Sequence, residues 1–149
     1  MHTKEMENFV KKNLEKLFPS RTNEKQIMCF TDLGLPSGTL WATYDVEEPI
    51  VEGCTLPSYE QAQELIEHCE FYVMEELDGT RYMTARGPNG QAIRFPMKDY
   101  EGTPGSSGCC WCAGALSEDF GYFMLLSEYT ITIGVGQRDL EFPYRMVRV

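Results

Sequence analysis

The sequence predicts an α+β domain in which antiparallel strands pack against one helix. A helix is expected at about 58–69, because Ser58 and Gln61 have the spacing of a capping box and apolar residues then recur every three or four positions. From Phe71 onward the apolar pattern alternates, which is typical of strands, and glycine-containing turns separate the segments. A chain of 149 residues is long enough to bury its own core without metal ions or disulfides.

A separate amphipathic helix is expected at about 4–18. Its apolar residues fall on one stripe, Pro19 ends it, and a polar linker follows. We therefore divide the chain into an N-terminal helix with its linker, 1–26, and a main domain, 27–149. The stripe is expected to pack on the main domain, on a second copy of the chain or on a partner. Its residues are Met6, Phe9, Val10, Leu14 and Leu17, with Phe18 at its end.

The main domain is expected to open with a strand, a turn and a second strand over residues 30–43. Gly34 and Gly38 can adopt a positive φ, and Pro36 disfavours helix at the residue before it. A buried group of large side chains is expected beneath this turn, formed by Leu33, Leu35, Leu40 and Trp41.

The later strands follow from turn residues and alternation. An Asp-Gly turn predicts a hairpin of strands at 71–74 and 81–85, and a third strand is expected at 92–96. Residues 100–108 are rich in Gly, Ser and Pro and predict a surface loop. The last third is strand-like, with segments at 109–112, 121–126, 130–133 and 142–149.

The charge distribution argues against two classes of partner. A formal net charge of −10 and a pI near 4.6 disfavour nucleic acids and anionic membranes. Residues 1–25 hold six Lys/Arg and four Asp/Glu, so the remainder carries −12. No run is apolar enough to span a membrane, and no secretory signal is recognisable. The chain as given is therefore expected in the cytoplasm, or outside it if a leader has been removed.

The cysteines offer one alternative function. Cys109 and Cys112 have the C-x-x-C spacing of redox dithiols and of half zinc sites. No second ligand pair has a matching spacing, and a strand here would point alternate residues to opposite faces. We expect reduced thiols and no metal or cofactor, and we keep a thiol redox or metal-dependent enzyme using Cys109 and Cys112 as the alternative.

Other enzyme templates find no match in the sequence. The only histidines are His2 and His68, so no nucleophile, base and orienting group can be assembled from recognisable motifs. No nucleotide-binding loop and no nucleophile elbow is present. The sequence therefore favours a protein that is not an enzyme.

The segment DLGLPSGTLWAT, residues 32–43, resembles the opening of the Fibrobacter succinogenes major paralogous domain family, which is common in Bacteroidetes-type bacteria and related to C-type-lectin-like folds. The helix-opening segment that starts at Leu56 and the GPNG-x-x-I-x-F-P segment, 87–96, resemble two further family segments in the same order. The resemblance spans about 30–149 and implies a C-type-lectin-like domain of twisted antiparallel sheets.

The resemblance also implies a non-enzymatic module that recognises a protein or a glycan through its late loop-and-strand region. Calcium-dependent sugar binding is not expected, because Glu48-Pro49-Ile50 lacks the amide of the sugar-binding tripeptides and no Trp-Asn-Asp is present. A third function is structural, with the N-terminal helix forming a homo-oligomer or a docking contact. The candidate ligand-binding residues are Tyr100, Ser106, Ser107, Trp111, Tyr122, Tyr129 and Arg138.

Overall fold

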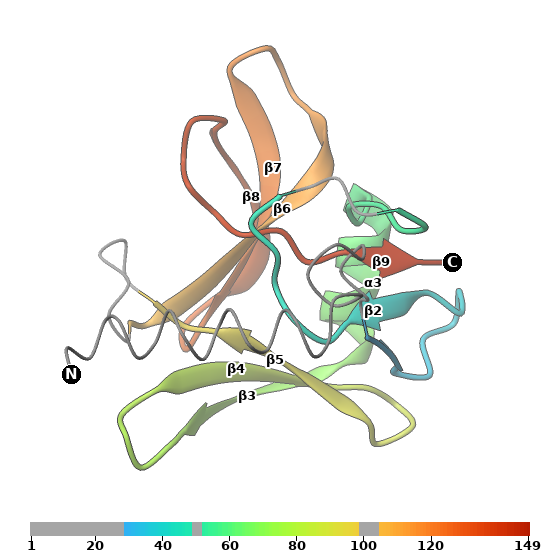
Figure 1. Cartoon of the computed structure of the whole chain (residues 1–149), viewed down its shortest axis with the longest axis vertical. Coiled ribbons are helices and arrows are strands. Elements are labelled where there is room, and N and C mark those ends of the chain that lie inside the picture. Colours follow the sequence, from blue (N-terminus) through green and yellow to red (C-terminus); the bar gives the residue numbers. More distant parts are fainter. Residues whose placement is uncertain (1–28, 49–51, 99–104) are drawn as a thin grey trace, which may run out of the picture.

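The chain forms an α+β domain of three antiparallel sheets and one helix within the residues that the computed structural model describes, 29–48, 52–98 and 105–149 (Figure 1). The sheet orders are β1-β2-β9, β3-β4-β5 and β6-β7-β8. This confirms the predicted α+β class. The elements are β1 Phe30–Asp32, β2 Leu40–Ala42, α3 Tyr59–His68, β3 Glu70–Glu75, β4 Arg81–Arg86, β5 Ala92–Pro96, β6 Ser107–Ala115, β7 Phe120–Ser127, β8 Ile131–Gln137 and β9 Val147–Arg148.

Several predictions fall on residues outside the described ranges. These are the N-terminal helix at 4–18 with its apolar stripe, the linker after it and the candidate site residue Tyr100. Among the described residues, no helix has the length and apolar character needed to cross a membrane.

Helix α3 begins where predicted because Ser58 caps it. The Ser58 hydroxyl accepts a hydrogen bond from the Gln61 amide at 3.1 Å, and the Ser58 amide donates to Gln61 Oε1 at 2.9 Å. Both halves of the capping box are therefore present, and two amides that the helix cannot satisfy find partners. Ala62 and Leu65 are fully buried on its core side, and the helix ends at His68, one residue before the predicted end.

Removing this cap should cost stability. We expect Ser58→Ala to lower the free energy of unfolding by about 1 kcal/mol, because the Gln61 amide loses its acceptor. Urea denaturation followed by circular dichroism measures this. Ser106→Ala, an exposed serine, is the matched control and should stay within about 0.5 kcal/mol of wild type. Equal stabilities for the two variants would contradict the expectation.

The sheet β3-β4-β5 confirms the predicted hairpin and third strand. Val73 pairs with Met83, and Met83 pairs with Phe95 on the next strand. The Asp78 carboxylate accepts from the Thr80 amide at 2.9 Å and shapes the turn. Met83 and Phe95 are buried, so this sheet lays one face on the core.

The sheet β6-β7-β8 differs from the prediction at two places. The surface loop expected to run through residue 108 ends earlier, because β6 already begins at Ser107. Gly108 lets β6 lie close to Pro96, since a Cβ at residue 108 would stand 2.8 Å from the Pro96 carbonyl oxygen. Strand β8 runs to Gln137 instead of ending at 133. Its glycines do not break the strand; they leave room for an aromatic ring from β7.

The sheet β1-β2-β9 joins the two ends of the described chain. The strand expected at 142–149 was wrong except for Val147–Arg148, the extent of β9. Pro143 has no amide hydrogen for a ladder, and Arg145 turns its side chain into the interior. Tyr144 makes only isolated bridges, to Val46 and to Trp111.

The opening segment packs as expected and meets a second sequence motif. Leu33 and Trp41 are fully buried, whereas Leu40 is only half-buried. The side-chain amide of Asn89 donates to the Asp32 carbonyl at 2.7 Å, so the 87–90 turn docks on the opening turn. The two turns therefore form one unit, although more than fifty residues separate them.

Candidate functional site

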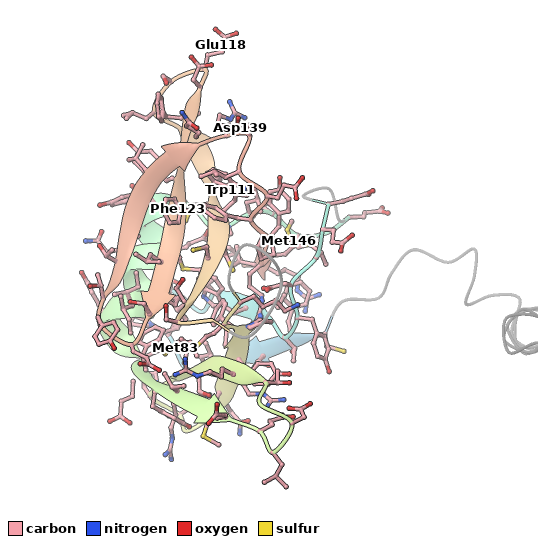
Figure 2. The ribbon with its side chains drawn as sticks, turned by 90° about the vertical axis from the view of Figure 1, so that its left-hand side faces the viewer. Met83, Trp111, Glu118, Phe123, Asp139 and Met146 are labelled. Carbon is pink, nitrogen blue, oxygen red and sulfur yellow. The ribbon has the colours of Figure 1, made fainter. Side chains whose placement is uncertain are left out.

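The β6-β7-β8 sheet extends past the other two sheets at one end. Figure 1 shows the β6–β7 hairpin projecting from the body of the molecule. Figure 2 shows Glu118 and Asp139 at this end and Trp111 and Phe123 further along the sheet, toward the body. We call the two connections there, 116–119 and 138–141, the distal end. Exposed apolar side chains lie on it, Leu116 and Leu140, and directly next to it, Phe120 at the start of β7.

An aromatic cluster lies on one face of this sheet. The ring centroids of Trp111 and Phe142 are 5.1 Å apart, and those of Phe123 and Phe142 are 4.8 Å apart. Trp111 and Phe123 meet edge to face at 6.1 Å, within the range of favourable aromatic pairs. Because the three rings come from β6, β7 and the segment after β8, they tie the C-terminal segment to the sheet.

A hollow of about 340 Å³ opens beside Trp111, and we call it the Trp111 hollow. Small residues form part of its lining where the β6–β7 register shifts between Trp111 and Ala115. A Cβ at Gly121 would stand 3.3 Å from the Trp111 ring, so glycine lets the ring lie close to β7. The lining residues are Leu56, Trp111, Cys112, Ala113, Gly114, Ala115, Gly121, Arg138 and Tyr144.

The chemistry of the Trp111 hollow suits binding. Arg138 is exposed at its rim and forms no ion pair within the part of the chain that the structure describes. A guanidinium can bind a carboxylate through two parallel hydrogen bonds. Half-buried Tyr144 adds aromatic surface, which provides contact area at a small cost in conformational entropy, whereas Trp111 exposes little of its ring.

The predicted site residues do not form one cluster. Trp111 and Arg138 line the Trp111 hollow, although Trp111 is only 7 % exposed. Tyr122 packs toward the core and meets Tyr59 edge to face at 5.5 Å. The other described candidates, Ser106, Ser107 and Tyr129, lie at the opposite end of the sheet. There Ser107 pairs with Ser127, next to the β7–β8 turn, and Tyr129 is 87 % exposed.

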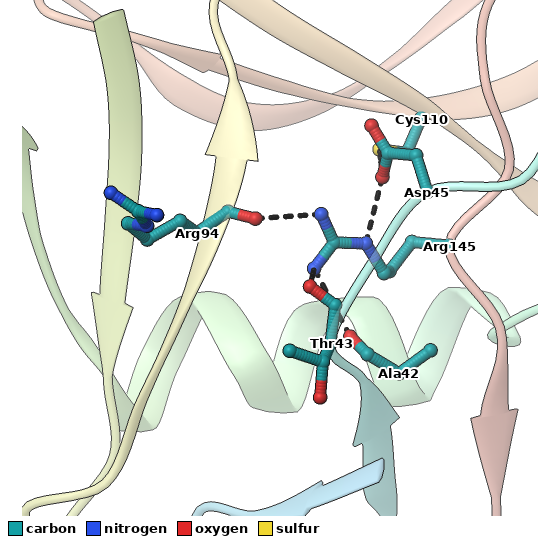
Figure 3. A network of polar contacts seen from close by, with 6 residues as sticks. All are labelled: Ala42, Thr43, Asp45, Arg94, Cys110 and Arg145. Carbon is teal, nitrogen blue, oxygen red and sulfur yellow. Dashed lines mark hydrogen bonds and ion pairs between the residues drawn. The ribbon is translucent and has the colours of Figure 1, made fainter. Parts of the chain in front are cut away.

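A buried arginine, Arg145, links β2 and the residues after it to β5 (Figure 3). Arg145 is 1 % exposed, and its Nε donates to Asp45 Oδ1 at 2.7 Å. Its two other nitrogens donate to main-chain carbonyls at 2.6–3.2 Å. The guanidinium also lies over the Phe95 ring. The charge is thus paired, and each of the three guanidinium nitrogens donates at least one hydrogen bond, as burial of a charge requires; the carbonyls belong to Ala42, Thr43 and Arg94.

The six cysteines all lie among the described residues, and no disulfide joins any two of them. Cys110 and Cys112 belong to the buried core, whereas Cys109 follows the alternation of β6 to the opposite face. Burial raises the pKa of Cys112 to about 12 and the pKa of Cys69 to about 11. Burial, with the charge of Asp45 nearby, also raises the pKa of Cys110 well above its ordinary value.

These thiols predict a loss of stability at alkaline pH. Cys112 stays protonated in the folded state up to about pH 12, whereas in the unfolded chain it ionises near pH 9. Ionisation therefore favours the unfolded state as the pH rises above 9, by up to about 1.4 kcal/mol per pH unit. Urea denaturation at pH 8 and pH 10 should show a steeper loss for wild type than for Cys112→Ala. Equal losses would contradict this.

A second hollow, of about 460 Å³, lies where α3 ends, against the 87–90 turn. Its lining includes the polar side chains His68, Glu70 and Arg86. Within the described ranges, no three His, Cys, Asp or Glu side chains converge as metal ligands would. This hollow therefore offers scattered single charges rather than a coordinated site.

No family model, no curated protein and no solved structure matches the chain. A functional proposal therefore has to rest on the geometry of the site.

Sequence reasoning missed several residues of this region. Asp45 and Arg145 are one hundred residues apart, and neither has a local pattern that predicts a buried pair. Tyr144 falls in the strand expected at 142–149 and is not among the expected site residues. The glycines gave the only usable signal, since Gly114 and Gly121 interrupt strand patterns, and such glycines often mark a bulge or a close approach.

Proposed function

We propose that this chain is a non-enzymatic recognition module that binds a protein or a glycan through the Trp111 hollow and the distal end of the β6-β7-β8 sheet. The observation that carries the proposal is the Trp111 hollow itself, where an aromatic wall, small residues and a guanidinium without an ion-pair partner among the described residues come together. Exposed Leu116 and Phe120 extend this surface with apolar area.

The C-type-lectin-like fold and membership of the major paralogous domain family are part of this proposal. Three observations support them. The described residues combine antiparallel sheets with one helix, the helix starts at the family's capping segment, and the 87–96 segment forms the turn and strand that the resemblance implies. The N-terminal helix, with its oligomerisation or docking role, stays a prediction.

The cysteines favour recognition over thiol chemistry. A catalytic thiol is activated by a lowered pKa, whereas burial raises the pKa of both Cys109 and Cys112. We expect iodoacetamide at pH 7.5 to alkylate these two thiols more slowly than it alkylates free cysteine. Peptide mapping after timed quenching measures each site. A rate at Cys109 above that of free cysteine would favour the enzyme alternative.

The binding surface can be tested with two variants of equal composition. Arg138→Glu with Leu116→Ser alters the distal end, and Arg86→Glu with Leu77→Ser makes the same changes at exposed residues elsewhere. Each protein is screened on a glycan array and against a displayed random-peptide library, with calcium and with a chelator.

We expect a ligand that wild type and the control variant bind alike and that the distal variant binds at least about tenfold more weakly. Loss of a charge contact and of apolar area accounts for an effect of this size. Equal binding by the distal variant, or no enriched ligand in either format, would overturn the proposal.

A further inference from the structure

Strand β8 forms an open edge of the β6-β7-β8 sheet. Among the strands that the structure describes, it pairs only with β7, and the hydrogen bonds at its two ends show which way each residue faces. Thr130 O accepts from the Ser127 amide, and the Arg138 amide donates to Asp119 O. Even-numbered residues therefore bond to β7, and the amides and carbonyls of odd-numbered residues point outward. The outward residues are Ile131, Ile133 and Val135.

The two edge strands of this sheet, β6 and β8, differ in the hydrogen bonds made on their outer sides. The outer edge of β6 is covered, since the Trp111 amide donates to Pro143 O and the Ala113 amide to Pro57 O. Along β8, the outward groups of Ile131, Ile133 and Val135 make no hydrogen bond to any residue that the structure describes. An edge of this kind is a template for another strand.

The composition of β8 lacks the devices that protect edges. Its seven residues, ITIGVGQ, include no charge and no proline, and its register with β7 is unbroken. Proteins blunt exposed edges with lysine, proline or bulges. The missing protection marks β8 as an edge that can accept a further strand.

The side chains on the two faces of β8 indicate which side chains of an added strand would pack well beside them. A Cβ at Gly134 would stand 3.0 Å from the Phe123 ring, and one at Gly136 would stand 3.1 Å from it. The ring thus covers both glycines on one face, and apolar or β-branched side chains of an added strand would pack beside it. Val135, 48 % exposed, offers apolar contact on the other face.

Charge selects among possible partners. The described residues hold 17 acids and 7 bases. A second copy of the chain would therefore meet long-range repulsion, whereas a cationic segment would be attracted. Four of the described carboxylates lie beside the end of β8, and Arg138 is the only base among the described residues of the two connections there; the acids are Glu118, Asp119, Asp139 and Glu141, all exposed.

We propose that β8 accepts an extended peptide segment of a partner protein as the fourth strand of this sheet. The segment carries apolar or β-branched residues at alternate positions and lysines or arginines at the end that lies beside the distal carboxylates. Backbone hydrogen bonds to Ile131, Ile133 and Val135 hold it, and side-chain packing and charge give selectivity. The inference rests on the proposed recognition function and names the partner's chemistry.

The test uses a synthetic peptide of alternating valine and threonine over seven residues with two lysines at each end. A second peptide has glutamates in place of the lysines. Val135→Pro removes one outward amide hydrogen and places a ring on the edge, which an edge strand tolerates. Val135→Ala trims the same side chain but keeps the amide and is the matched control. Isothermal titration calorimetry on the full chain gives each affinity.

We expect wild type and Val135→Ala to bind the lysine peptide within about threefold of each other, and Val135→Pro to bind at least about tenfold more weakly. The glutamate peptide should also bind at least about tenfold more weakly than the lysine peptide. Hydrogen exchange on unmodified protein gives an independent readout. The peptide should slow exchange at the amides of Ile133 and Val135 and leave Thr132 and Gly134 unchanged, because their amides already bond to β7.

Each other outcome overturns the inference. Equal binding by Val135→Pro, equal binding of the glutamate peptide, or no slowing at Ile133 and Val135 would do so. A dimer of the free protein that Val135→Pro dissociates would assign the edge to a second copy instead. If the lysine peptide does not bind but the distal variant still loses an array or library ligand, this inference fails while the proposed function stands.

Discussion

Replacing Arg145 with methionine is expected to lower the free energy of unfolding by about 3–5 kcal/mol. Methionine keeps much of the apolar stem but removes the charge and all of its donors. The Asp45 carboxylate then loses its partner, and the carbonyls of Ala42, Thr43 and Arg94 lose theirs. Unpaired buried polar groups cost far more than a surface contact returns. Urea denaturation followed by tryptophan fluorescence measures the change.

The matched control is Arg94→Met. This substitution removes an exposed ion pair with Glu76, 2.9 Å long, and a stacked contact with Tyr82. It keeps the Arg94 carbonyl that Arg145 uses. Exposed pairs contribute little, so we expect a cost of no more than about 1 kcal/mol. Comparable costs for the two arginines would show that burial does not amplify the contribution of Arg145.

A double variant separates the charge from the backbone contacts. Asp45→Leu together with Arg145→Met leaves no unpaired charge, so part of the stability lost in Arg145→Met should return. Full recovery is not expected, because the three carbonyls remain without their donor. A double variant less stable than Arg145→Met alone would contradict this reading of the network.

The features that the sequence predicted well are encoded locally. Ser58 and Gln61 are three residues apart, and the two hydrogen bonds between them lie within the first turn of the helix. The hairpin of β3 and β4 likewise follows from one Asp-Gly turn between two alternating segments. Such elements depend on propensity and spacing, which a single sequence displays.

The features that the sequence did not predict depend on contacts between distant segments. The C-terminal run containing Arg145 has a strand-like pattern, but the pairing with Asp45, one hundred residues earlier, draws it out of the ladder. The length of β8 depends on the Phe123 ring that fills the space above its glycines. The Trp111 hollow needs residues from four separate segments, so no single motif could reveal it.

The 87–90 turn illustrates how a local motif acquires a long-range role. Gly87 lies against the opening segment so closely that a Cβ there would stand 2.6 Å from the Leu33 Cβ and 2.8 Å from the Leu33 carbonyl carbon. The Asn89 amide groups then bond to the carbonyls of Asp32 and Leu33. The glycine is required by this close approach of two backbones and not by a positive φ.

Gly87→Ala should therefore lower the free energy of unfolding by about 3 kcal/mol or more, because backbone atoms of Leu33 must move to make room. Gly79→Ala is the matched control, since Gly79 has φ +89° and open space around its Cβ position. Only backbone strain acts there, and we expect a cost of about 1–2 kcal/mol. Urea denaturation followed by circular dichroism compares the two. A smaller loss of unfolding free energy for Gly87→Ala than for Gly79→Ala would mean that the two turns are not packed as tightly as the structure has them. The Asn89 hydrogen bonds alone would then have to hold the opening strands to β4 and β5.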